Sequence, residues 1–95
     1  MRRKSVVVIV ADSKARLYLT DLLESAGFPV RAFADPFSAL SFAQETRPDL
    51  IVLEDRLPAL DGVAPCPVLP WAAREPVRSG PFLAAVREIL KAPTH

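Results

Sequence analysis

The chain has 95 residues, of which 51% are hydrophobic and 24% charged, and its formal net charge is +1 at pH 7. This length allows one compact domain with a core, and the high hydrophobicity argues against disorder. The near-neutral charge argues against nucleic-acid binding, which needs a concentrated basic face, and the single cysteine excludes an internal disulfide or a multi-cysteine zinc site.

The first residues predict neither an export signal nor a membrane span. Residues 1–4 form a basic leader, and the apolar run that follows ends at Asp12, short of the roughly 18 residues that a span needs. We therefore expect a cytoplasmic protein without membrane contact.

The first strand and helix have clear boundaries. A β-branched run over residues 6–10 predicts a strand that is buried on both faces. Asp12 and Ser13 can cap a helix over residues 14–26, whose apolar residues recur at helical spacing and which Gly27 ends.

The next segment repeats the alternation. Residues 28–33 predict a second strand, Asp35-Pro36 starts a second helix that ends before Pro48, and residues 50–53 give a third strand. This β-α-β-α-β order predicts a parallel sheet with right-handed crossovers.

The pattern weakens after the third strand. Residues 63–80 are rich in proline and have no long periodic stretch, so we expect an irregular segment. A short strand can lie within residues 67–71, provided that Pro70 sits at a sheet edge or strand end. A final helix follows from Pro81, and residues 92–95 form a frayed tail.

Acidic residues stand where two neighbouring strands of the predicted sheet end. Asp12 follows the first strand, and Glu54 and Asp55 follow the third. Ligand sites of open parallel sheets lie at these carboxyl ends, and carboxylates suit Mg²⁺. The alternative is that Asp12 caps the first helix and that Glu54 and Asp55 begin a solvated loop. The residues by themselves leave both interpretations open.

Four motifs along the chain match one known family. In chain order they are Val8 to Asp12, Leu22 to Phe33, Pro48 to Gly62 and Gly80 to Phe82. Together they resemble the receiver domains of bacterial response regulators, notably those of FixJ type, over residues 5–91, with a patchy match after Gly62. The resemblance implies a single receiver-like domain over residues 1–95 with an α/β, flavodoxin-like, doubly wound parallel sheet in the order 2-1-3-(4)-5.

The resemblance also assigns a phosphoacceptor position. In receivers an Asp that accepts phosphate closes the third strand, with Pro four residues later and Asp-Gly at seven and eight. Pro58 and Asp61-Gly62 keep this spacing, which places Glu54 at the acceptor position. A shift of the strand end by one residue would place Asp55 there instead, but it turns side chains to the opposite sheet face and breaks the spacing.

Most of the other functional positions carry different residue types. The family's metal-binding acidic pair falls on Ala11 and Asp12, its lysine falls on Gly80, and no hydroxyl residue stands beside Trp71, where the family has Ser or Thr. The missing acid and the missing ammonium weaken binding of Mg²⁺ and of a phosphoryl group. The longer Glu54 side chain displaces its oxygens in a site where about 1 Å can cost about 100-fold in rate. We therefore expect no cofactor, with at most weak Mg²⁺ binding at Asp12 and Glu54.

These departures favour an atypical receiver, not an enzyme. We expect a pseudo-receiver of a two-component or phosphorelay system that binds a protein partner independently of phosphorylation. Its remnant acidic site comprises Asp12, Glu54 and Asp55, with Arg56 and Asp61 beside it. The main alternative is a Mg²⁺-dependent phosphoacceptor that takes phosphate from a histidine kinase on Glu54 or Asp55. Two less favoured interpretations are that Glu54 mimics the acylated state, and that the chain is a small Mg²⁺-dependent phosphotransferase or phosphatase.

The chain is also short for the fold that it resembles. Glu54 and Gly80 are 26 positions apart, about half of what two helices and a strand require. One or two helices between the third strand and the last helix should therefore be missing, which would leave apolar surface for a partner, and we expect a homodimer. The candidate partner-binding residues are Leu57, Leu60, Val63, Val68, Leu69 and Trp71. The alternative is that Trp71 and the prolines cover the sheet within one chain.

Overall fold

The computed structural model describes residues 4–54, 57, 64–71 and 79–91. In chain order its elements are β1 (Val6–Ile9), α1 (Ser13–Ser25), β2 (Val30–Phe33), α2 (Pro36–Thr46), β3 (Leu50–Glu54), β4 (Val68–Trp71) and α3 (Ser79–Lys91). The predicted strands and helices all appear, with boundaries that differ by a few residues at most.

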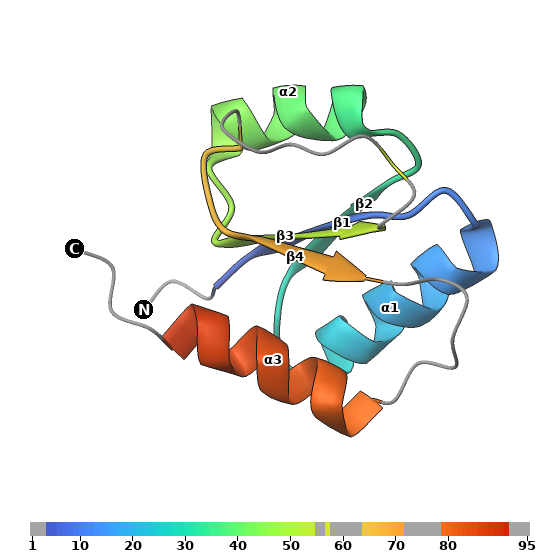
Figure 1. Ribbon diagram of the computed structural model, residues 1–95, viewed down its shortest axis with the longest axis vertical. Helices are drawn as coiled ribbons and strands as arrows, with labels where there is room; N and C mark the ends of the chain where they lie inside the picture. The colour runs from blue at the N-terminus through green and yellow to red at the C-terminus, as the bar shows by residue number, and fades with distance from the viewer. Residues whose placement is uncertain (1–3, 55–56, 58–63, 72–78, 92–95) are drawn as a thin grey trace.

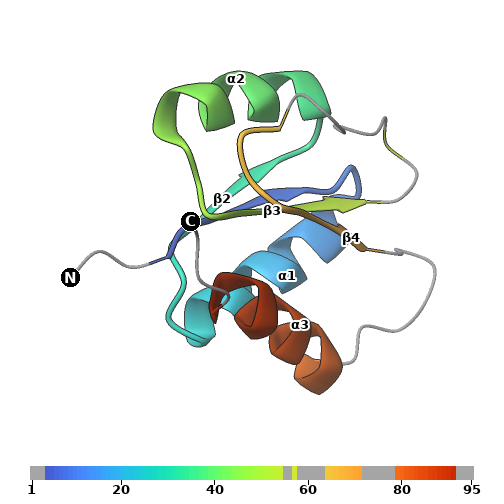
Figure 2. The ribbon, with the colours of Figure 1, turned by 60° about the vertical axis from the view of Figure 1, so that its left-hand side comes forward.

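The strands form one parallel sheet in the order β2-β1-β3-β4 (Figure 1). Helix α2 lies on one face, and α1 and α3 lie side by side on the other, which gives three layers (Figures 1 and 2). The predicted doubly wound α/β fold is confirmed. β4 occupies the place beside β3. Four strands make up the described sheet, so a fifth strand of the family's order is not among the described residues.

Each central strand contributes to two cores, because successive side chains of a strand point to opposite faces. Val6 and Val8 pack with Leu19 of α1 and Val86 of α3, and all four are buried. Val7 and Ile9, between and beyond them in β1, face α2 instead. The second core consists of Val7, Ile9, Ala39, Ala43, Ile51 and Leu53. Burial on both faces explains why β1 and residues 50–53 of β3 are apolar.

The helix ends follow the signals in the sequence. Asp12 and Asp35 are the N-caps of α1 and α2, and each carboxylate accepts a hydrogen bond from a backbone N–H three residues later, at 2.8 and 2.9 Å. Gly27, just after α1, has φ +96°, which a residue with a Cβ rarely adopts. Arg47 closes α2 in the left-handed region at φ 50° without being glycine.

β4 contains a proline and still pairs with β3. The Ile51 N–H donates to the carbonyl of Pro67 at 3.0 Å. Because backbone groups alternate sides along a strand, Leu69 and Trp71 also face β3 and the nitrogen of Pro70 faces outward. β4 is an edge strand, so the missing N–H of Pro70 costs no hydrogen bond within the sheet. The condition set for this strand, a proline at an edge, is met.

The sheet face opposite α1 and α3 is covered in two ways. α2 packs over β1 and β2. Beyond it Ile51 and Leu53 of β3 are 0% and 6% exposed, and partly buried side chains from outside α2 pack against their core. These side chains include Leu57, Ala64, Cys66 and Val68. Leu57, Ala64 and Cys66, together with Val68 of β4, thus help to cover this face within one chain. The intrachain alternative named Trp71 and the prolines for this role, but Trp71 packs on the opposite face, and Pro65 and Pro67 are exposed.

None of the helices in the described part of the chain is long and apolar enough to cross a membrane. Lys4 is exposed, while the rest of the expected leader and the tail at residues 92–95 lie outside the described residues.

Candidate functional site

The carboxyl ends of β1 and β3 bring the predicted acidic residues to one end of the sheet. Ile9 pairs with Leu53 in register, so the residues that follow β1 lie beside Glu54 at the end of β3. In Figure 1 the strand arrows point to the end of the sheet at which α1 begins. Asp12, the N-cap of α1, therefore belongs to the same end.

Glu54 is the only buried charged side chain in the described part of the chain, with 6% of its surface exposed. Its Oε1 accepts a hydrogen bond from the backbone N–H of Ala11 at 3.0 Å. A bond to an ionised acceptor is about twice as strong as a neutral one. Ala11 carries only a methyl group, so no second carboxylate repels Glu54 from this amide. The glutamate thus ties β3 to the chain that leaves β1, and its carboxylate is not directed into solvent.

Arg16 adds a cation that the sequence analysis missed. Its Nη1 donates to the carbonyl oxygens of Val10 at 2.8 Å and of Ala11 at 3.1 Å. Both peptide oxygens belong to the turn between β1 and α1, so the guanidinium holds the turn whose N–H binds Glu54. The sequence does show an arginine near the start of the helix that follows a buried strand. Which groups this arginine binds depends on how the turn between β1 and α1 folds, and the sequence does not show that.

Asp12 has a structural role here. It is exposed, and its Oδ2 accepts from the Ala15 N–H at 2.8 Å. Of the two interpretations that the sequence left open for Asp12, the structure displays the helix cap. Capping engages Oδ2 of this exposed side chain.

Glu54 and Asp12, the residues predicted to bind Mg²⁺ weakly, each accept a hydrogen bond from a backbone N–H, and the Arg16 guanidinium binds the turn between them. Mg²⁺ takes oxygen ligands in near-octahedral geometry, and its weak binding here stays a prediction. No group of three or more Asp, Glu, His or Cys side chains suited to a metal gathers within the described ranges. Asp55, Arg56 and Asp61, also predicted at this site, lie outside those ranges.

The position that resembles the family's lysine lies in α3. Gly80 is exposed in the first turn of this helix, and a Cβ built on it would meet no atom within 4 Å. Close packing therefore does not require glycine at this position.

The predicted partner-binding residues differ in exposure. Leu57, Val68 and Leu69 are half-buried, while Trp71 is 8% exposed and belongs to the core with α1 and α3. Leu60 and Val63 lie outside the described residues. A partner surface at these residues stays a prediction, and in this structure Trp71 is covered by its own chain.

The single thiol lies near the opposite end of the sheet. Cys66, in the segment that precedes β4, is half-buried, and this burial together with the negative charge of Asp49 raises the pKa of its thiol to about 11. Asp49 accepts from the backbone N–H of Ser5 at 2.8 Å, which joins the start of β3 to the start of β1. The thiol is therefore neutral at physiological pH and poorly nucleophilic.

Comparison with known proteins shows sequence relatives among response regulators. The DNA-binding response regulator MtrA of Mycobacterium tuberculosis (strain H37Rv) is 34% identical over 67 residues, which are 70% of this chain and 29% of that protein. The transcriptional regulatory protein PrrA of Mycobacterium leprae is 44% identical over 59 residues, 62% of this chain and 25% of that protein. The chain thus matches less than a third of the length of these relatives. No family model matches it.

Solved structures confirm the fold. A response regulator receiver protein from Burkholderia phymatum superposes with a TM-score of 0.79 at 20% identity, covering 96% of this chain and 98% of that one. The chemotaxis protein CheY4 of Vibrio cholerae gives a TM-score of 0.74 at 18% identity, over 93% and 99% of the two chains. The arrangement of strands and helices is that of the CheY-like receiver fold.

Proposed function

We propose that this chain, which belongs to the receiver domains of response regulators in two-component systems, is a pseudo-receiver that binds a protein partner without being phosphorylated. The observation that carries the proposal is the hydrogen bond from the Ala11 N–H to the buried carboxylate of Glu54. Through this bond, the side chain at the phosphoacceptor position makes a structural contact with the backbone.

The chemistry of phosphoryl transfer supports this proposal. A carboxylate that attacks phosphorus must present an oxygen to the donor, and positive charge must offset the charge of the transferred group. Oε1 of Glu54 is bonded to a backbone amide, and Asp12 caps α1. The family's other acid and its lysine are replaced by Ala11 and Gly80. The proposal accordingly includes no catalytic residue, no nucleic-acid contact and no resident cofactor, and a cytoplasmic location stays a prediction.

Phosphorylation is tested on the intact protein with Mg²⁺ and acetyl phosphate, followed by mass spectrometry. We expect no phosphoryl adduct, and no saturable backbone NMR shifts at residues 11, 12 and 54 on addition of Mg²⁺ and beryllofluoride. A receiver that retains the full set of family residues, treated in parallel, checks that the donor is active. Stoichiometric adduct on Glu54 or Asp55 would refute the pseudo-receiver and establish the phosphoacceptor alternative.

A second copy of the chain is the partner that we favour. β4 is an edge strand, and Leu57, Val68 and Leu69 around it remain partly exposed. Twofold pairing is the commonest way to cover such a surface. We expect light scattering to report a dimer between micromolar and millimolar concentrations.

Two lysine variants locate the dimer interface. Val68→Lys on β4 should give the monomer, because an edge charge opposes pairing. Ala32→Lys, at the other sheet edge in β2, should leave the dimer intact. A wild-type mass of 10.4 kDa at every concentration would refute the dimer and leave the pseudo-receiver to be judged by the phosphorylation test.

A further inference from the structure

A cavity of about 240 Å³ lies at the end of the sheet opposite the acidic site. It is open to solvent beside the edge strand β2, between the amino ends of β1 and β2 and the C-terminal half of α2. Its lining consists of Ser5, Val6, Val7, Pro29, Val30, Arg31, Phe42, Thr46 and Pro48. None of the residues that hold Glu54 contributes to it, so it is separate from the candidate site described above.

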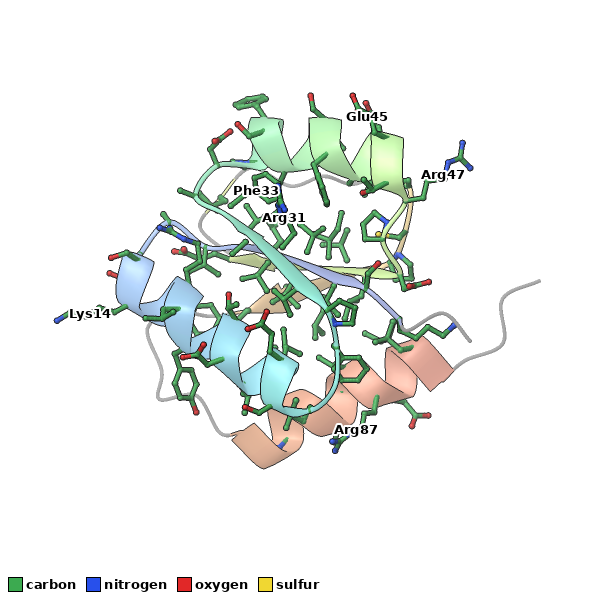
Figure 3. The ribbon with its side chains drawn as sticks, turned by 180° about the vertical axis from the view of Figure 1, so that it is seen from behind. Lys14, Arg31, Phe33, Glu45, Arg47 and Arg87 are labelled. Carbon is green, nitrogen blue, oxygen red and sulfur yellow. The ribbon has the colours of Figure 1, made fainter. Side chains whose placement is uncertain are left out.

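Arg31 is the only charged residue in this lining. Its guanidinium carbon lies 5.2 Å from the centre of the Phe42 ring, which positions the cation over the aromatic face. Phe42 is in turn packed against Phe33, with ring centres 5.4 Å apart. Figure 3 shows Arg31 and Phe33 on the side of β2 that faces α2. The guanidinium has no carboxylate partner among the residues that the structure describes, and its side chain remains exposed.

The rest of the lining is mostly apolar, with hydroxyl groups at its margin. Val6, Val7 and Pro48 are buried and present carbon to the cavity. The Thr46 hydroxyl donates to the Phe42 carbonyl at 2.7 Å, so its oxygen can still accept a hydrogen bond. The cavity therefore joins an apolar floor to one oriented cation.

We propose that this cavity binds a small apolar carboxylate, such as an aromatic or branched aliphatic acid. An anion is favoured because Arg31 is the one charged residue that lines the cavity and no acidic residue lines it. The planar fork of an arginine fits a carboxylate with two parallel hydrogen bonds. The apolar floor selects a hydrocarbon body over a small inorganic ion.

The volume agrees with this class of ligand. An engineered apolar cavity of about 150 Å³ accepts benzene. The cavity at β2 is larger, about 240 Å³, which leaves space for a ring together with a carboxylate at its mouth. It is below the roughly 300–1,000 Å³ of sites for drug-sized ligands, so a fragment of benzoate size is the appropriate probe.

The experiment is an NMR titration of the whole chain with benzoate, and with benzamide as the neutral analogue of the same shape. We expect benzoate to shift the backbone amides of residues 5–7, 30, 31 and 46 in a saturable way, and benzamide to bind at least about tenfold more weakly. Equal shifts by both compounds, or benzoate shifts confined to other residues, would overturn the proposal.

Two matched arginine variants test the role of the cation. Arg31→Gln should weaken benzoate binding at least about tenfold, the equivalent of one charge-assisted hydrogen bond. Arg87→Gln removes the same charge from the exposed side of α3, in the opposite layer, and should leave binding unchanged (Figure 3). Arg31→Lys, which keeps the charge without the fork, should bind between wild type and Arg31→Gln. Unchanged affinity in Arg31→Gln would refute the site.

Discussion

Replacing Glu54 with alanine should destabilise the fold by about 1–2 kcal/mol. The mutation removes the bond between the Ala11 N–H and Oε1, at 3.0 Å. A hydrogen bond to a charged group contributes about 1.5–3 kcal/mol, and we place the value here at the lower end because Ala11 is an exposed residue and the bond is only partly buried. The mutation also removes a charged group from a side chain that is only 6% exposed, and the desolvation cost that this removal eliminates offsets part of the loss of stability.

A substitution series at this position separates length from charge. Glu54→Gln keeps the reach and an acceptor oxygen, so it should cost less, about 1 kcal/mol. Glu54→Asp withdraws the carboxylate from Ala11 and leaves an unpartnered charge at a buried position, so it should cost at least as much as alanine. The expected order of stability is wild type, then Gln, then Ala, with Asp equal to Ala or below it.

Urea unfolding measures this order through the fluorescence of Trp71, the single tryptophan of the chain. Its indole is 8% exposed in the core shared with α1 and α3, so unfolding changes its surroundings strongly. Glu45→Ala, on the exposed surface of α2, is the matched control and should change stability by no more than about 0.5 kcal/mol. If Glu54→Ala falls within that margin, or if Glu54→Asp is more stable than Glu54→Gln, the structural role assigned to the carboxylate is wrong.

Three further predictions concern other positions. The hydrogen bond from the Ser38 backbone N–H lowers the pKa of Asp35 below its ordinary value of 3.8. The stability that this cap contributes is therefore fully present above pH 3.8 and is lost as the pH falls through the lowered pKa. Asp35→Asn should remove this part of the pH profile of unfolding, and an unchanged profile would contradict the prediction. The raised pKa of Cys66, from 9.0 to about 11, gives stability that is complete below pH 9 and is lost as the pH rises through 11. It also predicts alkylation by iodoacetamide at pH 8 about 100-fold slower in the folded than in the urea-unfolded chain, and equal rates would refute it. Gly27→Ala should cost about 1–2 kcal/mol in thermal unfolding through its φ of +96° alone, because no atom lies within 4 Å of the added Cβ; a neutral change would disprove the left-handed turn.

Much of the fold could be predicted because its signals are local. The caps at Asp12 and Asp35 depend on a side chain and an amide three residues apart, and the stop at Gly27 depends on one backbone angle. The parallel sheet follows from the alternation of strands and helices. The strand around Pro70 required one further condition, an edge position, and the sheet order meets it.

The details of the candidate site could not be predicted, because they depend on contacts between distant residues. The resemblance placed Glu54 at the acceptor position, but the direction of its carboxylate is decided by the Ala11 amide, 43 positions away. The target of Arg16 is decided by the course of the turn after β1. The extra length of the Glu54 side chain does not by itself indicate whether its carboxylate makes a buried contact or projects into solvent.

The cover on β3 and β4 was also left open by the sequence. In a helix, apolar residues at helical spacing indicate the buried face. A proline-rich segment has no such periodicity, so its sequence does not indicate which side chains point inward. Ala64 and Cys66 pack against the core of Ile51 and Leu53 through their individual positions in space. Exposed apolar surface was therefore a reasonable expectation from the length of the chain, and it is reduced by contacts that no pattern encodes.

The order of the sheet explains how a short chain can keep the receiver fold. β1 and β3 lie at the centre, and their two faces belong to separate cores. β4 lies at one edge of the described sheet, so the two central strands keep both of their neighbours without a further strand beside β4. The carboxyl ends of β1 and β3 meet beside each other, and the bond from the Ala11 N–H to Glu54 joins them. The proposed dimer interface at β4 and the proposed Arg31 site beside β2 both lie at the edges of the sheet, where binding would not disturb the central strands.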